Sequence, residues 1–566
     1  MLGLCFTASR AQVAAYLLGV ALFSISFLVF LNSSISFVIT QRIGQARHVG
    51  DAVGTLGFAD ELVALVACPA WGLLSDRVGV RSVAVMGYVI VGAALWTLVQ
   101  ATNVYPQLLL ARILFSVGGS ATATMVTAIL PTMTLVAPAA HDAPASPPRP
   151  ERSSHAVTPS ISSELTITPA RFRSTSPEGA PEPAPKTDTT ASTSQLAGLV
   201  GTFTGCGALV ALGAFLPLPT RFQHAGHTPA AAVADAFYVV GAIAMLVALA
   251  CFFGLRNLPG EEAKGWGRRQ HAFDTRRVLS YPRLFLASLR LGLTSPTIGL
   301  GYVGGFVARA SSVAISLFIP LFANHYFLRT GECAVDPSNP SDIKHACPQA
   351  YQLAAMLTGV SQLIALMCAP LFGYLSGRYP RYNLPLLVAA AAGIAGYSAF
   401  ASLASPDPRS EDGTGAIFAI VALLGISQIG AIVCSLALLG RGINNDDARP
   451  SEAAGSAFGS ASHPSAGATP PSSTPCTPLD EDAPLLGGGS VSRPTASLDS
   501  HSHNHIKGLI AGTYSLIGGF GILLLTKAGG ALFDSSGPGA PFYMMAGFNA
   551  LLLVVGIAVS VRQAVR

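Results

Sequence analysis

The stretch that decides the fold is Gly72-Leu73-Leu74-Ser75-Asp76-Arg77-Val78-Gly79-Val80-Arg81. It lies between two apolar runs, residues 54–75 and 83–101, and each run is long enough to cross a bilayer as a helix. Glycines let helix ends approach closely, and a carboxylate can bind backbone N–H groups at the start of a helix. Arginines in a short loop favour the cytoplasmic side. The stretch therefore predicts a tight cytoplasmic turn between two transmembrane helices.

Composition extends this prediction to the whole chain. Charged residues make up 11% of the 566 residues, against about 25% in soluble domains, and 51% are apolar. Every backbone polar group in a bilayer must be bonded within its own segment, so apolar spans are expected to be helices. Twelve such spans can be drawn, at residues 12–40, 54–75, 83–101, 106–130, 195–216, 233–255, 297–323, 351–374, 384–404, 414–440, 507–531 and 541–562.

Basic residues set the expected orientation. Most of the 33 lysines and arginines fall in segments that lie inside when both termini are cytoplasmic, and the bias persists in the short loops. The formal charge of +5 therefore reflects membrane topology. We expect the lipid bilayer as a partner and no nucleic acid, since no nucleic-acid-binding module is present.

The spans are interrupted by three polar segments. Residues 138–194 and 441–506 are rich in Pro, Ser, Thr, Ala and Gly, and are expected to be disordered cytoplasmic loops, because they have too little apolar surface to offset the entropy of ordering. Residues 257–296 form a basic cytoplasmic linker. Its stretch from Tyr281 to Leu293 is either an amphipathic helix on the anionic leaflet or a plain solvated linker.

Two six-helix halves are therefore expected. Helices 1–4 lie within residues 1–137 and helices 5–6 within 195–256 of the N-terminal half. Helices 7–10 lie within residues 297–440 and helices 11–12, with the C-terminus, within 507–566.

The turn at residues 72–81 resembles the signature of major facilitator transporters, G-x-L-a-D-r-x-G-r-k, at Gly72, Leu74, Asp76, Arg77, Gly79 and Arg81. A degenerate copy at residues 373–381 follows the eighth span, with Gly377 at the acidic position. The resemblance implies an all-α membrane protein with twelve transmembrane helices in two pseudo-symmetric six-helix bundles and a central cavity open alternately to each side. It also implies that Gly72, Asp76, Arg77, Gly79 and Arg81 control the exchange between these states.

The fourth span is similar to a motif of drug/proton antiporters. Arg112-Ile113-Leu114-Phe115-Ser116-Val117-Gly118 matches R-x-x-x-G-x-G with Ser116 in place of the first glycine, and the motif's arginine is thought to assist proton transfer. Arg112 is expected either to face the bundle interior with a partner or to extend to the outer surface. Asn32 occupies the place where many such antiporters carry an acid. The Gly-Pro pair of the antiporter motif is missing from the fifth span.

Asp60 and Glu61 in the second span are the candidate proton carriers. Adjacent side chains point in different directions on a helix, so we expect at most one of them to face the cavity. A carboxyl group in an apolar cavity can exchange protons near neutrality. The alternatives are a water-facing pair near the outer end of the helix, or ion pairs with Arg42 or Arg47.

In the second half, Arg309 and Lys527 are cations within apolar sequence. They are expected to bind an anionic substrate or to pair with Asp60 or Glu61. Together with Gln362 and Gln428, they predict a cavity with polar contacts.

Two features concern the loops. Cys333 and Cys347 share a non-cytoplasmic loop and form a plausible disulfide in an oxidising compartment. The run Glu481-Asp482-Ala483-Pro484-Leu485-Leu486 fits the acidic dileucine pattern read by clathrin adaptors, with Glu481, Leu485 and Leu486 as its determinants. The run 103–108 and the end of the fourth span, 129–132, also resemble a fungal, vacuolar-membrane branch of the superfamily. A vacuolar membrane is therefore the favoured location and the plasma membrane the second.

The expected function is proton-coupled movement of a small organic molecule, by export or vacuolar sequestration, as in multidrug antiporters. A monomer is expected, without cofactor or metal, and no arrangement of catalytic residues indicates an enzyme. The alternative is a transporter-derived nutrient sensor that binds its ligand without turnover.

Overall fold

The computed structural model describes residues 8–45, 49–134, 186–261, 264, 281–330, 348–380, 382–410, 413–446 and 506–565. Within these residues, 12 helical spans are long and apolar enough to cross a membrane. The predicted all-α fold with twelve transmembrane helices is therefore confirmed. Most of the predicted loops 138–194 and 441–506 lies outside the described residues, namely 138–185 and 447–505, as do Cys333, Cys347, Glu481, Leu485 and Leu486.

The N-terminal half consists of six spans, several of which contain a short π-helical segment, labelled η. In chain order they are α1 (Arg10–Ala14), η1 (Ala15–Ala21), α2 (Leu22–Phe37) and η2 (Val38–Ile43); α3 (Val49–Val78); α4 (Val80–Leu98); η3 (Val104–Leu108) and α5 (Leu109–Met133); α6 (Lys186–Val210), η5 (Ala211–Phe215) and α7 (Leu218–His224); and α8 (Pro229–Gly254).

The C-terminal half repeats this arrangement after the short helix α9 (Tyr281–Thr294). Its spans are α10 (Pro296–Val313), η6 (Ala314–Phe318) and α11 (Ile319–Arg329); α13 (Pro348–Arg378); α14 (Leu384–Ala401); α15 (Ile417–Asp446); α17 (Lys507–Leu524), η9 (Leu525–Gly529) and α18 (Gly530–Ser536); and α19 (Ala540–Val565).

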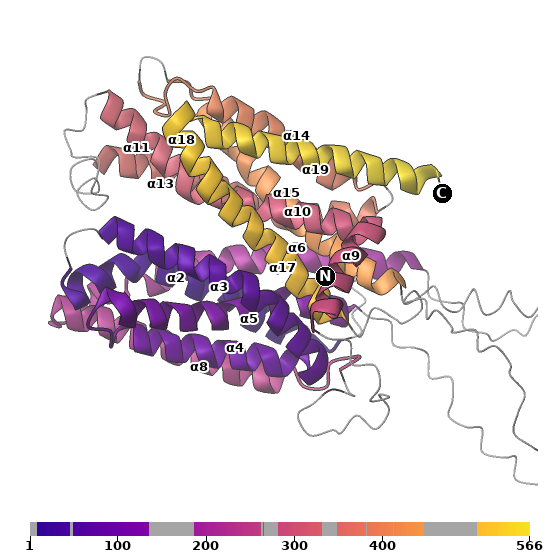
Figure 1. Cartoon of the computed structure of the whole chain (residues 1–566), viewed down its shortest axis with the longest axis horizontal. Coiled ribbons are helices and arrows are strands. Elements are labelled where there is room, and N and C mark those ends of the chain that lie inside the picture. Colours follow the sequence, from indigo (N-terminus) through magenta and orange to yellow (C-terminus); the bar gives the residue numbers. More distant parts are fainter. Residues whose placement is uncertain are drawn as a thin grey trace, which may run out of the picture.

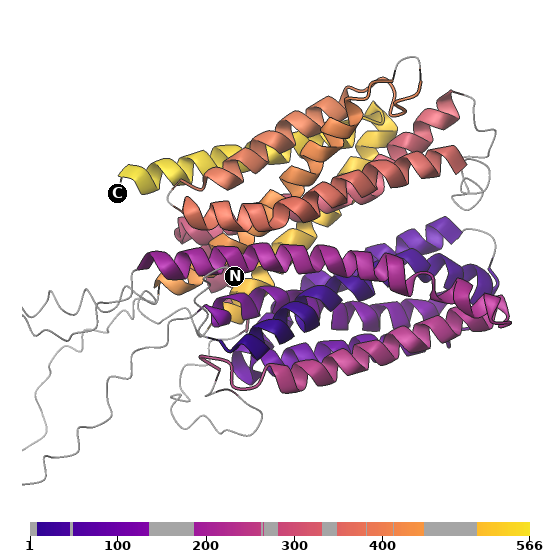
Figure 2. The same ribbon diagram turned by 180° about the vertical axis from the view of Figure 1, so that it is seen from behind.

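The two halves lie side by side, meet at one end and diverge toward the other (Figures 1 and 2). We call the end where they meet the inner end; it carries Asp76 and Lys507, and the charge distribution predicts that it is cytoplasmic. Glycines allow the close approach. A Cβ atom on Gly72 of α3 would collide with the carbonyl oxygen of Gly508 on α17. A Cβ atom on Gly198 of α6 would lie 2.8 Å from the Cα atom of Gly373 on α13.

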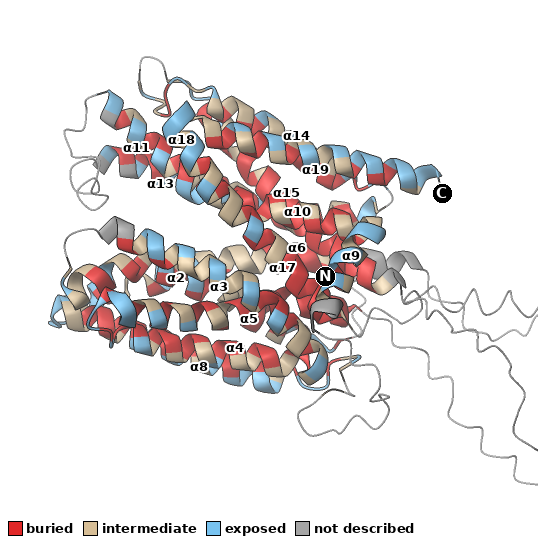
Figure 3. Ribbon diagram, in the orientation of Figure 1, coloured by how far each residue is buried: buried red, intermediate tan, exposed pale blue. Residues whose placement is uncertain are grey.

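Burial within each half follows from a membrane environment. Figure 3 shows buried residues where helices pack together, and exposed residues on the outside of the bundles. Large apolar side chains such as Leu246 on α8 and Val554 on α19 are nevertheless exposed. Lipid tails are as apolar as leucine, so these side chains suit a surface that faces lipid.

Three segments differ from their prediction. The predicted loop 441–506 begins too early, because α15 continues to Asp446. The predicted loop 138–194 ends too late, because α6 begins at Lys186. Its first residues are polar, but Ser192, Thr193 and Ser194 are buried, and Thr193 Oγ1 donates to Thr134 Oγ1 at 2.9 Å. The stretch from Tyr281 onward is a helix, α9, and not a plain linker. Its Ser288 hydroxyl lies 2.7 Å from Thr513 Oγ1 of α17, while Leu293 is exposed.

Candidate functional site

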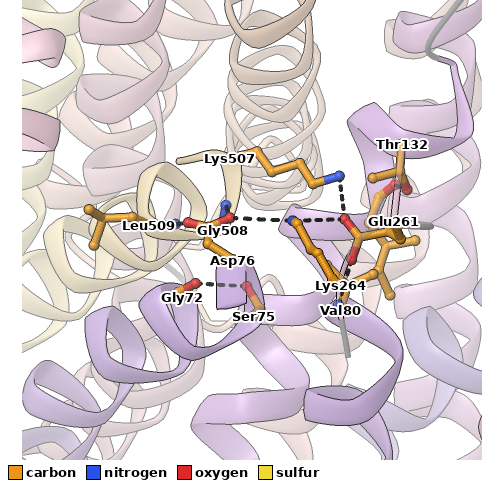
Figure 4. Close-up of polar contacts among 11 residues, drawn as sticks. Gly72, Ser75, Asp76, Val80, Thr132, Glu261, Lys264, Lys507, Gly508 and Leu509 are labelled. Atoms are coloured by element: carbon orange, nitrogen blue, oxygen red, sulfur yellow. Dashed lines mark hydrogen bonds and ion pairs between the residues drawn. The ribbon is translucent and has the colours of Figure 1, made fainter. Parts of the chain in front are cut away.

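Asp76 joins the two halves at the inner end. It stands in the last turn of α3, and its carboxylate accepts hydrogen bonds from the backbone N–H groups of Gly508 and Leu509, both at 2.8 Å (Figure 4). These N–H groups belong to the first turn of α17, where they have no partner within the helix. The negative charge also lies at the positive end of the helix dipole. A side chain of one half therefore caps a helix of the other.

Glu261, which sequence reasoning missed, forms a second link. It follows α8, and its Oε2 atom accepts from the N–H of Val80 at the start of α4, at 3.0 Å. Its Oε1 atom lies 2.5 Å from Lys507 Nζ of α17 and 3.0 Å from Lys264 Nζ (Figure 4). Lys507 is 1% exposed, so this ion pair between the halves is shielded from water.

The charges at the inner end are balanced. Lys264 Nζ also lies 4.0 Å from Asp76 Oδ1, so the cluster holds two carboxylates and two ammonium groups. Burial alone would raise the pKa of Glu261, but Lys507 and Lys264 outweigh burial and hold that pKa below its usual value. Glu261 therefore remains ionised at neutral pH. We call Asp76, Glu261, Lys264 and Lys507 the inner cluster.

The other predicted gating residues have different surroundings. Gly79 has φ +96, a conformation that favours glycine, and lets α4 begin directly after α3 ends. Arg81 remains within the N-terminal half: its Nε donates to the carbonyl oxygen of Phe252 at 2.8 Å, and its guanidinium lies 4.2 Å from that ring. Arg77 is exposed and makes no hydrogen bond or ion pair with the residues that the structure describes. Of the five, Gly72 and Asp76 contact the other half.

A cavity of about 190 Å³ lies between the halves. Its walls come from α2, α3 and α5 on one side, and from α10 and α17 on the other, with a contribution from α4. Five of the sequence candidates line it: Asn32, Asp60, Glu61, Arg112 and Arg309.

Arg112 is the centre of a polar cluster on the N-terminal wall. Its Nε donates to Asp60 Oδ2 at 2.6 Å, its Nη2 also contacts that oxygen, and Nη2 donates to Asn32 Oδ1 at 2.5 Å. The side chains of Arg112 and Asp60 are 4% and 14% exposed. Arg112 therefore faces the interior, and the alternative of extension to the outer surface is wrong. Two buried atoms of the pair, Asp60 Oδ1 and Arg112 Nη1, have no hydrogen-bond partner among the described residues.

Both acids of the second span line the cavity, contrary to the expectation that at most one would. Asp60 points toward α5, where Ser116 Oγ also donates to its backbone carbonyl at 2.8 Å. Glu61 points toward the other half: a Cβ atom on Gly519 of α17 would lie 3.9 Å from its Oε2 atom. Because α3 lies at the seam between the halves, two side chains with different directions both reach the cavity. Arg42 binds the carbonyl of Val99 at 2.8 Å and is no partner for either acid, and Arg47 lies outside the described residues.

Arg309 reaches the cavity from near the C-terminal end of α10. Its charge acts on Glu61, but the two side chains form no ion pair. Within the described part of the chain, Arg309 makes no ion pair and no hydrogen bond, and it is half-buried. Ser515 of α17, another cavity residue that sequence reasoning missed, is buried, and its hydroxyl has no partner in the part of the chain that the structure describes.

The structure does not bring the remaining candidates to this cavity. Gln362 Nε2 donates to Gln428 Oε1 at 3.2 Å, and Gln428 Nε2 donates to Ser312 Oγ at 3.0 Å, so both glutamines join helices of the C-terminal half. Lys527 lies 4.4 Å from the centre of the Phe58 ring.

The chain has relatives of known fold. Residues 22–136 and 192–463, more than half of the chain, match the family described as Major Facilitator Superfamily. The fucose:proton symporter FucP of E. coli covers 97% of this chain and 99% of its own length, with a TM-score of 0.52 and 12% identity. The proton:xylose symporter XylE covers 96% and 94%, with a TM-score of 0.52 and 12% identity.

A bacterial homologue of the iron transporter ferroportin, in an outward-facing state, covers 99% of this chain and 100% of its own, with a TM-score of 0.55 and 12% identity. At these identities the likeness shows the fold alone. None of the curated proteins is similar to the chain in sequence.

Proposed function

Because this chain belongs to the major facilitator superfamily of membrane transporters, we propose that it carries a small organic solute by alternating access, with protons as the coupling ion. The observation that supports this proposal is the Arg112–Asp60 pair. It is buried in one half, yet it lines the cavity that both halves share. No observation in the described part of the chain favours the alternative of a sensor that binds without turnover.

A proton on Asp60 changes which arrangement of the helices is stable. The ionised carboxylate holds Arg112 through a charge-assisted hydrogen bond between α3 and α5. Protonation removes that negative charge and leaves a buried guanidinium held by Asn32 alone among the described residues. An uncompensated buried charge is costly, so proton binding shifts the balance between conformations.

The inner cluster makes the second contribution to the free-energy difference between the conformations. Asp76 with α17, and Glu261 with Lys507, are bonded while the inner end is closed. Opening the inner end separates α3 from α17 and breaks these contacts. Their strength therefore sets how readily the cavity opens to the inner side.

The size of the cavity limits the solute. Drug-sized ligands occupy pockets of about 300–1,000 Å³, whereas this cavity has about 190 Å³. We therefore propose a small metabolite and not a multidrug substrate. We keep export or vacuolar sequestration as the direction and the vacuolar membrane as the location. The antiporter-like pattern around Arg112 and the dileucine pattern at Glu481, Leu485 and Leu486, through clathrin adaptors, support these assignments.

The proposal is tested in liposomes that contain the purified protein and a pH-sensitive dye. A panel of small carboxylates, sugars, amines and amino acids is added outside under an imposed pH gradient. We expect at least one solute to move protons through the wild type, and Asp60→Asn to abolish this movement while downhill solute exchange persists.

Asp235→Asn is the matched control, because Asp235 pairs with His227 at the surface and does not line the cavity. The proposal is overturned if no solute moves protons, or if Asp60→Asn couples as well as the control.

A further inference from the structure

Arg309 is a charge without a counter-charge in contact. A guanidinium cannot be deprotonated in a protein, and a cation within a membrane helix is costly unless it is paired. Arg309 lies near the C-terminal end of α10, lines the cavity, and forms no ion pair or hydrogen bond with the described residues. Lys527, another cation in a membrane span of this half, lies against Phe58 and does not line the cavity.

Glu61, which carries the opposite charge to Arg309, likewise has no counter-charge in contact among the described residues. It lines the cavity from the N-terminal half and forms no ion pair or hydrogen bond with the described residues. The charged groups that act on it are Arg309 from α10, Asp60 beside it, and Arg112 from α5. The residues of α17 at this cavity, Ser515, Gly519 and Ile522, carry no charge. Asp60 and Arg112 neutralise each other, so Glu61 and Arg309 remain as two separate, opposite charges on facing walls.

Unpartnered hydrogen-bonding atoms lie in the same walls. Ser515 Oγ on the C-terminal wall and Asp60 Oδ1 and Arg112 Nη1 on the N-terminal wall are buried and have no partner among the described residues. Buried polar atoms are nearly always bonded, so such atoms in a cavity are available to a ligand. The C-terminal wall offers a guanidinium and a hydroxyl, and the N-terminal wall offers carboxylate oxygens and one N–H group of Arg112.

The geometry points to a small zwitterion, of the amino-acid class, as the solute: its carboxylate on Arg309 and Ser515, and its ammonium group on Glu61 and the free oxygen of Asp60. The inference rests on the proposed transport function. A guanidinium binds a carboxylate through two parallel hydrogen bonds, and an ammonium group donates three. A solute with one charge would leave either Arg309 or the ionised form of Glu61 uncompensated. A cavity of about 190 Å³ limits the solute to the smaller members of this class.

This assignment also links the solute to the proton. A proton on Glu61 removes the charge that holds the ammonium group, so proton and zwitterion compete at Glu61. Competition at Glu61, added to the effect of the proton on Asp60, leads to exchange, in which protons and the solute cross the membrane in opposite directions. The zwitterion also bridges Glu61 of the N-terminal half and Arg309 of the C-terminal half, so its binding favours approach of the two walls.

The test measures the thermal unfolding midpoint of the purified full-length protein with α-, β- and γ-amino acids of small size, because a ligand of the folded state raises that midpoint. The best amino acid is then compared with its hydroxy acid, which lacks the ammonium group, and with its amide, which lacks the carboxylate. We expect the affinity for the zwitterion to be at least about tenfold higher than the affinity for either analogue.

Variants show which side chain binds the carboxylate and which binds the ammonium group of the zwitterion. Arg309→Gln should weaken zwitterion binding about tenfold or more and bring it to the level of the amide, whereas Arg309→Lys should restore part of the affinity. Glu61→Gln should weaken binding and reduce its dependence on pH, while Asp60 still titrates beside the ammonium group. Lys527→Gln is the matched control and should bind as the wild type does.

The possible outcomes separate this inference from the proposed function. If the analogues bind as well as the zwitterion, or if no amino acid shifts the midpoint, the inference is overturned. If sugars or amines move protons and amino acids do not, the transport proposal is supported and the assignment of a zwitterionic solute is wrong. If amino acids bind as predicted and no solute crosses the membrane, the ligand class is supported and the transport proposal fails.

Discussion

The inner cluster and the cavity treat their charges in opposite ways. At the inner end, Asp76 binds two backbone N–H groups of α17, and Glu261 contacts two lysines and a backbone N–H group. In the cavity, Glu61 and Arg309 face each other from different halves without an ion pair. Charges that are fully bonded stabilise one conformation, whereas charges without contacts are available to a ligand. The same two halves are therefore held together at one end and left open to a solute in the middle.

The Arg112–Asp60 pair is intermediate, because its charges are bonded to each other but also line the cavity. Breaking this pair should have the largest effect. Arg112→Gln leaves Asp60 with its charge buried and unpaired, at a cost of about 3 kcal/mol. We expect a lower thermal midpoint and no solute-driven proton movement. The double variant Asp60→Asn with Arg112→Gln should recover most of the stability without recovering coupling, because removing both charges is close to neutral. A single variant as stable as the wild type would show that the pair is not desolvated as described.

The Glu261–Lys507 ion pair should have the next largest effect. Glu261→Gln, Lys507→Gln and the double variant form a cycle that isolates the coupling between the two side chains. Because the pair is buried and bonded, we expect a coupling of about 2 kcal/mol in favour of the closed inner end. The readout is the fraction of protein cross-linked between α3 and α17 through introduced cysteines. Additive single effects would mean that the two side chains do not stabilise the closure together.

Asp76 should have a smaller effect, because its neutral isostere keeps part of the contact. Asp76→Asn removes the charge at the start of α17 but retains one acceptor, at a cost of about 1 kcal/mol. Transport should slow about fivefold while the protein still reaches its membrane. Arg77→Gln is the control within the same turn, since Arg77 is exposed and unbonded in the described structure. Equal rates for the two variants would remove Asp76 from the gate.

The pH dependence of the Glu261 contacts should be the weakest effect near neutrality. The pKa of Glu261 is held below its usual value while the inner end is closed. A depressed pKa stabilises the closed state above the ordinary value of about 4.3, and this contribution is lost as the pH falls through the depressed value. The contribution of Glu261 to closure should therefore not change between about pH 5 and pH 8. The advantage of the wild type over Glu261→Gln in thermal midpoint should persist down to about pH 4.3 and shrink only at lower pH, and an advantage that is lost above about pH 5 would contradict the assignment.

The sequence predicted the features that depend on local pattern. Twelve spans follow from hydropathy, and Asn32, Asp60, Glu61, Arg112 and Arg309 were identified because polar residues in apolar helices are costly. The same criterion selected Gln362, Gln428 and Lys527, which lie elsewhere, because cost does not reveal which way a side chain points.

The inner cluster could be predicted only in part. Asp76 belongs to a recognisable turn, but Glu261 and Lys507 lie far apart in the chain, and their contact arises when α17 crosses α3. The only signal in the sequence is that each is a charge directly beside an apolar span. The inward position of both acids was also missed, because it depends on the place of α3 at the seam between the halves.

The most direct test of this account is the distance between spin labels on the two halves, at Arg77 and Arg378 for the inner end and at Arg221 and Arg329 for the outer end. These four residues are exposed, and each pair joins the two halves. In solute-free protein, we expect Asp76→Ala combined with Lys507→Gln to lengthen the inner distance and shorten the outer one. Arg309→Gln combined with Glu61→Gln should leave both distances as in the wild type. Unchanged distances in the first variant, or an opened inner end in the second, would contradict the division between charges that hold the halves closed and charges that bind the solute.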